Sequence, residues 1–402
     1  MRKNIIIGDL GTIITGKTPP TTNKNYYGDY AVFIKPTDIS EQSKYTYETE
    51  EMYSKLAAEK YESSLIPKGA ICVPCIGTIG TKMTMAPCDC YTNQSINSIV
   101  CNDNYDNEYV YYLNKNFLPG LKAYNLGTAS GREYVSKSNF EKIELVAEQD
   151  KTIQKKIGEF LSRYDSLIEN YQKQIKLLEE AAQRLYKEWF VELRFPGHES
   201  TKIVDGVPEG WEKKSISQLG DYLNGFAFKP SDWQEKGKPI IKIKEMGNGV
   251  SDETPRNNGE RVPSRYLVKA GDLIFSWSAT LMVIIWTGEE GWLNQHLFKV
   301  TPAKGIGREF LLQTISKAIL EFSNLTTGST MKHIQRNKLN QVFVNTPSSE
   351  VMEKYNEIAE SLRTKVLNIS SQLHLLTEAR DRLLPKLMGG VMDVVLENYP
   401  AI

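Results

Sequence analysis

The chain has 402 residues, with 49 basic and 49 acidic side chains, 40% hydrophobic residues and five cysteines. The length predicts two or three globular domains, and zero net charge argues against a protein that coats nucleic acid nonspecifically, because such binding scales with the phosphates neutralised. The longest apolar run, residues 279–286, is too short to span a bilayer, the start lacks the apolar stretch of a secretory signal, and five cysteines form no disulfide framework. We therefore expect a cytoplasmic chain with reduced thiols and no membrane span.

Two regions of mixed character come first and third along the chain. Short apolar runs rich in β-branched and aromatic residues are broken there by Gly, Pro and Asn, a pattern typical of α/β structure with many loops. The runs expected to be strands are 30–34, 70–73 and 96–100 in the first region, and 240–243, 273–277 and 281–286 in the third.

A long helix is predicted after each mixed region. Apolar residues recur with alternating spacings of four and three from Ile157 to Trp189, and again at the same ten positions shifted by 198, from Tyr355 to Leu387, with Arg380 as the one exception. A 3.5-residue repeat keeps one seam facing a partner helix. Taken alone, either seam could also belong to a helix that packs against the core of its own domain. Two matching seams favour an antiparallel pair, because a whole domain separates the helices along the chain.

The sequence contains two copies of one unit. Gly11 and Gly16 match Gly220 and Gly225, and Asn93-Gln94 matches Asn294-Gln295, with an offset that falls from 209 to 198 along the chain. A falling offset indicates small loop insertions between copies. We expect an α+β protein of approximate twofold symmetry, with two mixed domains separated by two antiparallel coiled-coil helices. The expected boundaries are 1–150 and 196–346 for the domains, 151–195 for the central helix, and 347–402 for the C-terminal helix and tail.

Three motifs suggest chemistry, and their context argues against each. The phosphate-loop pattern from Gly11 to Thr18 is followed by Pro19 and Pro20, which prevent the helix it needs, so its glycines more plausibly serve a turn. Zinc binding by four cysteines is disfavoured because the second pair is spaced too tightly and the other copy has no cysteine there. The four histidines are scattered. The cysteines are Cys72, Cys75, Cys88 and Cys90, and the histidines are His198, His296, His333 and His374. No catalytic or metal site is expected.

Polar, basic segments occupy matching places in the two copies. Residues 127–137 and 328–338 both run from a small-residue loop into a basic segment that precedes an apolar strand. A solvated loop would explain either one alone. Their duplication favours contact with phosphates and base edges, which Arg, Lys, Asn, Gln and His side chains can make.

At this point the chain resembles the DNA-specificity subunit of type I restriction-modification systems, over nearly its whole length. The stretches that carry the resemblance are 67–73 (PKGAICV), 77–80 (GTIG) and 93–96 (NQSI), together with the last helix, 375–390. The second copy departs by having residues 276–280 (SWSAT) in place of the GTIG loop.

The resemblance implies a subunit that performs no chemistry itself. Each mixed domain would be a target-recognition domain that reads one half of a split double-stranded DNA sequence, and the helices would fix the unread spacer. Two modification subunits, bound largely to the helices, would methylate adenine N6 with S-adenosylmethionine. Restriction subunits would supply cleavage driven by ATP with Mg²⁺. This chain would hold neither cofactor nor metal.

Two sets of residues are candidates for these roles. The expected DNA-binding residues are Lys82, Asn93, Gln94, Arg132, Tyr134, Lys137, Asn294, Gln295, His296, Lys332, His333, Arg336 and Lys338. The expected partner-binding helices carry Ile157, Leu161, Ile168, Ile175, Leu178, Leu185, Leu362, Val366, Ile369, Leu373, Leu376 and Leu383.

The alternative function is a coiled-coil scaffold that organises protein partners without reading DNA. A solitary methylating or nicking enzyme is disfavoured by the missing motifs. Charge is unevenly spread, with 15 basic against 18 acidic residues in 1–150 and 19 against 16 in 196–346. Neither region is basic enough to hold duplex DNA strongly alone, so we expect much of the salt-sensitive grip to come from partners.

Overall fold

The structure is a computed structural model that describes residues 1–77, 79–127, 133–325 and 336–392. It divides into two compact units: unit 1 is Met1–Asn170 with the chain from Leu375 onward, and unit 2 is Tyr171–His374. Each unit therefore combines a globular module with a stretch of each of two long helices, α4 (Lys151–Tyr186) and α7 (Ser349–Gly389). Across the described ranges, no helix combines the length and hydrophobicity that crossing a bilayer requires.

Module 1, the globular part of unit 1, contains two four-stranded sheets. One has the order β2-β9-β6-β7 and is antiparallel, and the other has the order β3-β5-β4-β8 with β4 and β8 parallel. Strands β1 and β10 form a separate antiparallel pair. The strands are β1 (Arg2–Ile6), β2 (Gly11–Thr15), β3 (Tyr27–Gly28), β4 (Ala31–Ile34), β5 (Met52–Tyr53), β6 (Ile71–Pro74), β7 (Thr84–Met85), β8 (Tyr91–Thr92), β9 (Ile96–Cys101) and β10 (Glu144–Glu148). The α-helices are α1 (Lys55–Lys60), α2 (Asn107–Phe117) and α3 (Lys137–Glu141).

Module 2, the globular part of unit 2, repeats this plan. The order β14-β21-β18-β19 forms an antiparallel sheet, and β16-β15-β20-β17 forms a mixed sheet with β15 and β20 parallel. The strands are β11 (Ile203–Val204), β12 (Val207–Pro208), β13 (Glu212–Ser215), β14 (Gly220–Asn224), β15 (Lys238–Ile241), β16 (Arg256–Asn257), β17 (Leu267–Val268), β18 (Leu273–Ser276), β19 (Met282–Ile285), β20 (Gly291–Leu293), β21 (Leu297–Pro302) and β22 (Phe343–Thr346). The α-helices are α5 (Ile243–Asn248) and α6 (Arg308–Leu325).

The strand registers confirm the duplication residue by residue. Gly11 pairs with Cys101 in module 1, and Gly220 pairs with Pro302 in module 2. Gly220 follows Gly11 by 209 residues and Pro302 follows Cys101 by 201 residues, which are the offsets between the two copies in the sequence. The six expected strands all form, although the run 240–243 ends its strand at Ile241 because α5 begins at Ile243.

The two matched glycines that follow β2 and β14 are needed for close approach of two backbone segments. A Cβ on Gly16 would lie 2.1 Å from the carbonyl oxygen of Thr92, and one on Gly225 would lie 2.1 Å from that of Asn294. Amide hydrogen bonds from Gly16 to Ile96 and from Gly225 to Leu297 fix these crossings at 3.2 and 3.0 Å. At both crossings only glycine lets the two backbone segments come this close.

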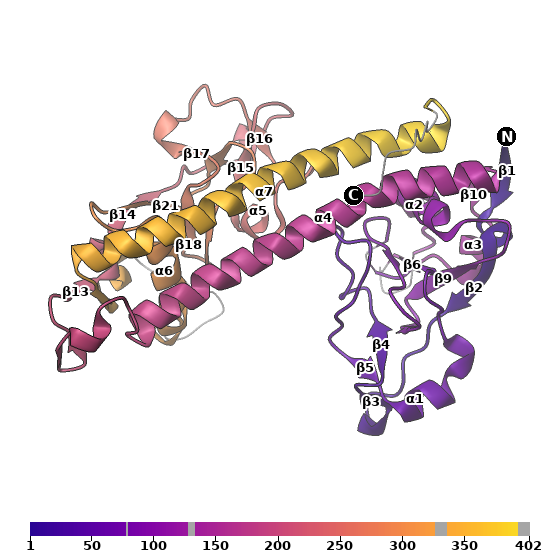
Figure 1. The fold of residues 1–402 in the computed structure, drawn as a ribbon. Helices are drawn as coiled ribbons and strands as arrows, with labels where there is room; N and C mark the ends of the chain where they lie inside the picture. Colours follow the sequence, from indigo (N-terminus) through magenta and orange to yellow (C-terminus); the bar gives the residue numbers. More distant parts are fainter. Residues whose placement is uncertain (78, 128–132, 326–335, 393–402) are drawn as a thin grey trace. The chain divides into compact units, whose positions relative to one another are not determined.

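The predicted seam is confirmed in both long helices. Helices α4 and α7 run side by side in opposite directions (Figure 1). All twenty seam positions are buried or partly buried, and the last one of the first seam, Trp189, lies in a π-helical turn, Lys187–Val191, that follows α4. In unit 1, Ile157 and Leu161 join the core of module 1 with Leu387 and Met388. In unit 2, Tyr186 and Tyr355 join the core of module 2. Each seam thus buries apolar surface against the other helix and against a module.

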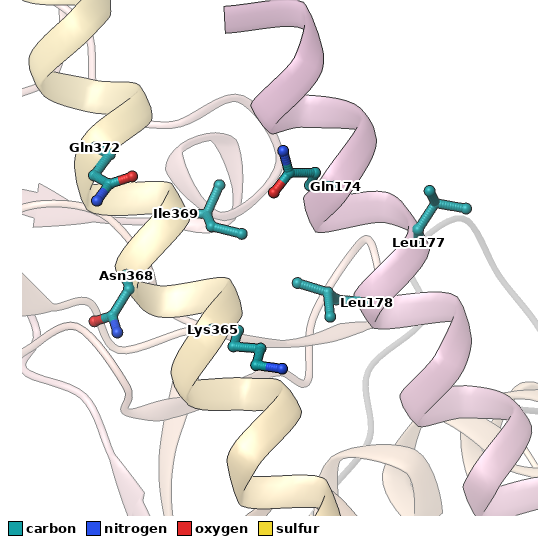
Figure 2. Close-up of a pocket in the computed structure, with 7 residues that line it drawn as sticks. All are labelled: Gln174, Leu177, Leu178, Lys365, Asn368, Ile369 and Gln372. Carbon is teal, nitrogen blue, oxygen red and sulfur yellow. The ribbon is translucent and has the colours of Figure 1, made fainter. Parts of the chain in front are cut away.

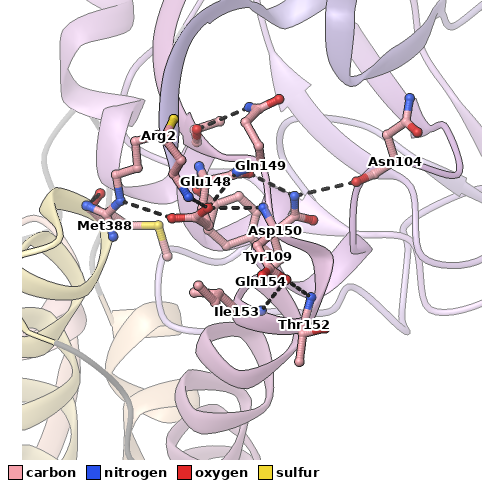
Figure 3. Close-up of polar contacts among 12 residues, drawn as sticks. Arg2, Asn104, Tyr109, Glu148, Gln149, Asp150, Thr152, Ile153, Gln154 and Met388 are labelled. Atoms are coloured by element: carbon pink, nitrogen blue, oxygen red, sulfur yellow. Dashed lines mark hydrogen bonds and ion pairs between the residues drawn. The ribbon is translucent and has the colours of Figure 1, made fainter.

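A buried glutamine anchors the start of α4 to module 1 (Figure 3). The Gln154 side chain is fully buried; its Nε2 donates to the Glu148 carbonyl at 2.8 Å, and its Oε1 accepts from the Asp106 amide at 2.8 Å. Asp150 caps the helix by accepting the Thr152 amide at 2.8 Å. At the other end of the same cluster, Arg2 donates to the Met388 carbonyl at 2.6 Å, at the end of α7. These contacts tie both helix ends in unit 1 to module 1.

Arg380, the exception in the predicted seam, is satisfied by a buried ion pair. Its Nη1 lies 2.6 Å from Oδ1 of Asp165 on α4, and the two side chains are only 5% and 4% exposed. Tyr112 of α2 donates its hydroxyl to Asp165 at 2.5 Å. Burial alone would raise the pKa of Asp165, but the charges of Lys115 and Arg380 and these hydrogen bonds hold it below its ordinary value.

Candidate nucleic-acid interface

Each module has the same turn immediately before the central strand of its antiparallel sheet. In module 1, Asn93 accepts the Ser95 amide on its Oδ1 at 3.0 Å, and its carbonyl accepts the Ile96 amide at 3.1 Å. In module 2, the Asn294 carbonyl accepts the Leu297 amide at 3.0 Å. Asn294 is 6% exposed. In this geometry the two asparagines shape the turn, and the residues that follow them are the ones presented at its surface.

The residues after the two asparagines differ between the modules. Gln94 is exposed and accepts a hydrogen bond from the Thr18 hydroxyl. Gln295 and His296 are partly exposed, with their Nε2 atoms 3.4 Å apart. The Nδ1 atom of His296 is buried and has no hydrogen-bond partner among the described residues. The turn therefore presents amide and imidazole groups that can donate to or accept from base edges.

A hairpin loop lies beside this turn in both modules and shares an unusual backbone. Gly77 follows β6 with φ +86°, and Ala279, at the equivalent place after β18, has φ +56°. Both loops thus keep the left-handed conformation at a matched position, and in module 2 it is imposed on an alanine. Ser276 holds this loop by donating to the carbonyls of Ser278 and Thr280 at 3.2 and 2.8 Å. Strained backbone of this kind is found preferentially at functional sites.

One residue of this loop, Trp277, reaches the turn and was not among the predicted site residues. The indole Nε1 of Trp277 donates to Oδ1 of Asn224 at 3.1 Å, and its ring centroid lies 5.7 Å from that of His296. The module 1 counterpart of Trp277 is Cys75, whose amide bonds to the Ser95 carbonyl as the Trp277 amide bonds to that of His296. The replacement of the GTIG loop by SWSAT was the available signal.

The remaining candidates in module 1 lie around its hairpin loop. Lys82 is partly exposed in the loop before β7. Tyr134 forms an isolated bridge with Ile76, so the segment that follows residue 132 runs beside the loop. Lys137 begins α3, where its Nζ lies 3.6 Å from a carboxylate oxygen of Glu141. Arg132 lies outside the described residues.

The candidates near residues 328–338 are only partly described. Lys332 and His333 lie outside the described residues, and so does the side chain of Arg336, which begins a 3-10 helix, Arg336–Asn340. Lys338 donates from Nζ to Oε1 of Gln341 at 3.2 Å.

The rejected motifs have no support in the geometry. In the described part of the chain, no three His, Cys, Asp or Glu side chains gather as a metal site. Burial raises the pKa of Cys72 to about 11 and that of Cys75 to about 12, so both remain thiols at neutral pH. The segment after Lys17 contains a short 3-10 helix, Lys24–Tyr26, where a phosphate loop requires an α-helix directly after the lysine.

The candidate partner-binding residues lie along the helix seam. Ile157, Leu161 and Ile168 are at most 3% exposed. In unit 2 the seam opens into a cavity of about 420 Å³ between α4 and α7 (Figure 2), lined by Gln174, Leu177, Leu178, Lys365, Asn368, Ile369 and Gln372. Leu177, which lines this cavity, and Leu375 are apolar side chains of the helices that are 54% and 60% exposed. The outward faces are the surfaces available to other proteins.

Comparison with known proteins decides the family. The family described as type I restriction modification DNA specificity domain matches residues 3–180 and 208–373, which is most of the chain and both modules. The chain belongs to this family. It is a type I restriction-modification specificity subunit, and as such a non-catalytic one, with the cofactors of the system residing in the modification and restriction subunits. The scaffold that reads no DNA is therefore not supported.

Relatives and a solved structure agree with this assignment to the specificity-subunit family. The chain is 26% identical to the type I restriction enzyme MjaIX specificity subunit of Methanocaldococcus jannaschii, over 96% of this chain and 93% of that protein. It is 38% identical to the HindI specificity subunit of Haemophilus influenzae over 158 residues, which cover 38% of this chain and 33% of that one. The crystal structure of the type I S subunit from M. genitalium matches over 96% of both chains with a TM-score of 0.57 and 16% identity, which shows a shared fold.

Proposed function

We propose that each module of this specificity subunit reads one half of a bipartite DNA target, and that the two helices set the length of the unread spacer. The observation that carries the proposal is the repetition of one strand framework with different side chains at its exposed turn. Module 1 presents Gln94 and Ser95, whereas module 2 presents Gln295 and His296 beside Trp277. A shared framework with different hydrogen-bonding groups is suited to reading two different sequences.

The two turns and their hairpin loops form the proposed reading surfaces. Gln94, Gln295 and His296 contact base edges in this proposal, while Asn93 and Asn294 hold the turns in shape. Lys82, Tyr134, Lys137 and Lys338 contact phosphates or sugars and set the orientation of the duplex. Arg132, Lys332, His333 and Arg336 keep their predicted role in DNA contact. The proposed target-recognition domains are residues 1–150 and 196–346, each followed by one of the two helices.

The partners complete the function. Two modification subunits bind the outward faces of the helices and methylate adenine N6 in each half-site, and restriction subunits join them for ATP-driven cleavage. The modules contribute little excess positive charge, so the partners supply most of the salt-sensitive affinity. The complex works in the cytoplasm, where its DNA lies.

Single substitutions in one module test the assignment of half-sites. His296→Ala and Gln295→Ala, each assembled with the modification subunit, are expected to weaken discrimination at positions of one half-site by about 1–3 kcal/mol, because each removes a base-edge partner. Gln94→Ala is expected to affect only the other half-site. The measurement is binding to a panel of duplexes that carry one substituted base pair each.

His374→Ala is the matched control for His296→Ala, because His374 is exposed on α7 and lies outside both turns. It should leave the whole binding panel unchanged. Equal losses in both half-sites from His296→Ala, or no loss from any of the three turn variants, would contradict the proposed reading surfaces.

A further inference from the structure

The two long helices differ in charge at two pairs of matched positions, one on the seam and one beside it. A shift of 198 residues converts the α4 seam into the α7 seam, and nineteen of the twenty seam positions are apolar. The same shift relates Asp165 to Arg363 and Ala182 to Arg380. The helices are therefore near copies in their apolar residues but carry opposite charges at the first of these positions.

In unit 1 the charged position of α4 faces α7. Asp165 binds the guanidinium of Arg380 at 2.6 Å, with both side chains almost fully buried. The second partner of Arg380, Asp381, has a side chain that is 53% exposed. The buried charge of Arg380 thus depends chiefly on Asp165.

In unit 2 the matched position is filled by a small residue. Arg363 of α7 is 4% exposed and binds the buried carboxylate of Glu309 on α6 at 2.8 Å, and its Nη1 lies 3.7 Å from Glu179 of α4. Ala182, three residues after Glu179 on the same face of α4, is 2% exposed. The counterpart of the Asp165–Arg380 contact is therefore Ala182 against Arg363.

We infer that these residues make each long helix select the other helix of its own chain and reject a second copy of itself. If two α4 helices paired in the same register, Asp165 would face Ala182 and lose its guanidinium partner. If two α7 helices paired, Arg380 would lose Asp165 and face Arg363, whose carboxylate partner is Glu309. Buried charges without a partner are strongly destabilising, so self-pairing is disfavoured on both sides.

The apolar seam cannot make this choice by itself. Because its residues recur at the same positions in both helices, a copy of α4 offers α4 nearly the same apolar surface that α7 does. The single charged pair breaks that equivalence. This selection keeps two different modules in one subunit, and it is independent of how DNA is read.

Reversing the charge at position 380 tests the inference in the full-length chain. With Arg380→Asp, position 380 repels Asp165 within the chain but attracts Arg363 of a second copy. Unfolding in urea and refolding over a range of concentrations should leave the wild-type chain at its 45.6 kDa mass. The variant should show at least a tenfold higher dimer fraction by light scattering. Arg382→Asp is the matched control, because Arg382 lies on the same helix with its side chain 76% exposed; it should stay monomeric.

A cysteine reporter identifies which helices pair. In an antiparallel pair of two α4 helices, Asp165 of one copy would lie opposite Ala182 of the other, so the centre of the pair would fall between residues 173 and 174. The Gln174 side chains of the two copies would therefore lie side by side only if α4 paired with α4. With Gln174→Cys, and with the exposed Cys88→Ser in every sample, a bismaleimide should cross-link Arg380→Asp dimers and leave the Arg380 chain uncross-linked.

Four results would overturn the inference. Two of them concern Arg380→Asp: a folded variant that stays monomeric, and dimers that do not cross-link through residue 174. The other two are a wild-type chain or an Arg382→Asp control whose dimer fraction equals that of Arg380→Asp. If Arg380→Asp does not fold, the variant Arg380→Ala provides the test. In that variant Asp165 and Arg363 each face an alanine, both when α4 pairs with α7 and when each helix pairs with a second copy of itself. Its dimer fraction should exceed that of the wild type, and an unchanged fraction would also overturn the inference.

Discussion

Ala279 shows how a single residue records the loop geometry shared by the two modules. It occupies the left-handed conformation that Gly77 adopts at the matched place, and it is exposed, so its side chain gains little packing there. A left-handed conformation costs a residue with a Cβ roughly 1–2 kcal/mol. Module 2 therefore bears a local strain that module 1 avoids.

Ala279→Gly is expected to stabilise module 2. The relief of backbone strain should exceed the added entropy of the unfolded chain, for a net gain of about 0.5–1 kcal/mol. Urea unfolding of the full chain measures the change. The neighbouring Thr280→Gly is the control, because Thr280 has no positive φ, and it should lower stability. Equal effects of the two variants would show that Ala279 is not strained.

Gly225 should tolerate no side chain. Gly225→Ala places a Cβ 2.1 Å from the Asn294 carbonyl oxygen, so the crossing of β14 and the turn must open. We expect a loss of about 3 kcal/mol or more. In Gly247→Ala the nearest atom to the new Cβ is 4.0 Å away, so that variant should keep wild-type stability. Thermal unfolding of both variants checks the prediction, and comparable melting temperatures would contradict it.

At the scale of elements, the Asp165–Arg380 contact ties the pairing of α4 with α7 to pH. Because the folded pKa of Asp165 lies below its ordinary value, its contribution to stability is fully present above the unfolded pKa of about 4 and is lost as pH falls through the folded pKa. Asp165→Asn should therefore cost about 3 kcal/mol at pH 7. The difference from wild type should shrink as pH falls below about 4.

Amide hydrogen exchange of unit 1, recorded between pH 7 and pH 3, measures the free energy of unfolding of both proteins and so tests this change. Asp29→Asn, on the exposed surface of module 1, should leave the pH profile unaltered. A constant difference between wild type and Asp165→Asn over the whole pH range would mean that the charge of Asp165 contributes nothing.

The two long helices and six of the strands were predictable because their signals are local or periodic. A repeat of 3.5 residues identifies a seam without knowledge of its partner, and the second copy tests each assignment of the first. The partner of Arg380 was not predictable, because Asp165 lies 215 residues earlier and Tyr112 comes from another element. Similarly, the roles of Asn294 and Trp277 depend on a turn and a hairpin loop that only tertiary structure brings together.

At the scale of the whole molecule, the net charge of zero agrees with a specificity subunit that works with partner subunits. A reader that works inside a larger complex needs selective groups at its turns more than a strongly basic surface. The 15 basic against 18 acidic residues of 1–150 and the 19 against 16 of 196–346 agree with this division of labour. Assembly with the modification subunits should consequently steepen the salt dependence of DNA binding compared with this chain alone.

The most direct test of the account is methylome sequencing of cells that carry this subunit with its modification partner. Two readers on a fixed pair of helices should yield one split motif, with two unlike specified halves, methylated adenine N6 in each half, and an unread spacer of constant length. One added base pair would shift the second half by about 3.4 Å and rotate it by roughly a tenth of a turn, so a different spacer should abolish methylation. A single contiguous motif, or a spacer of variable length, would contradict the account.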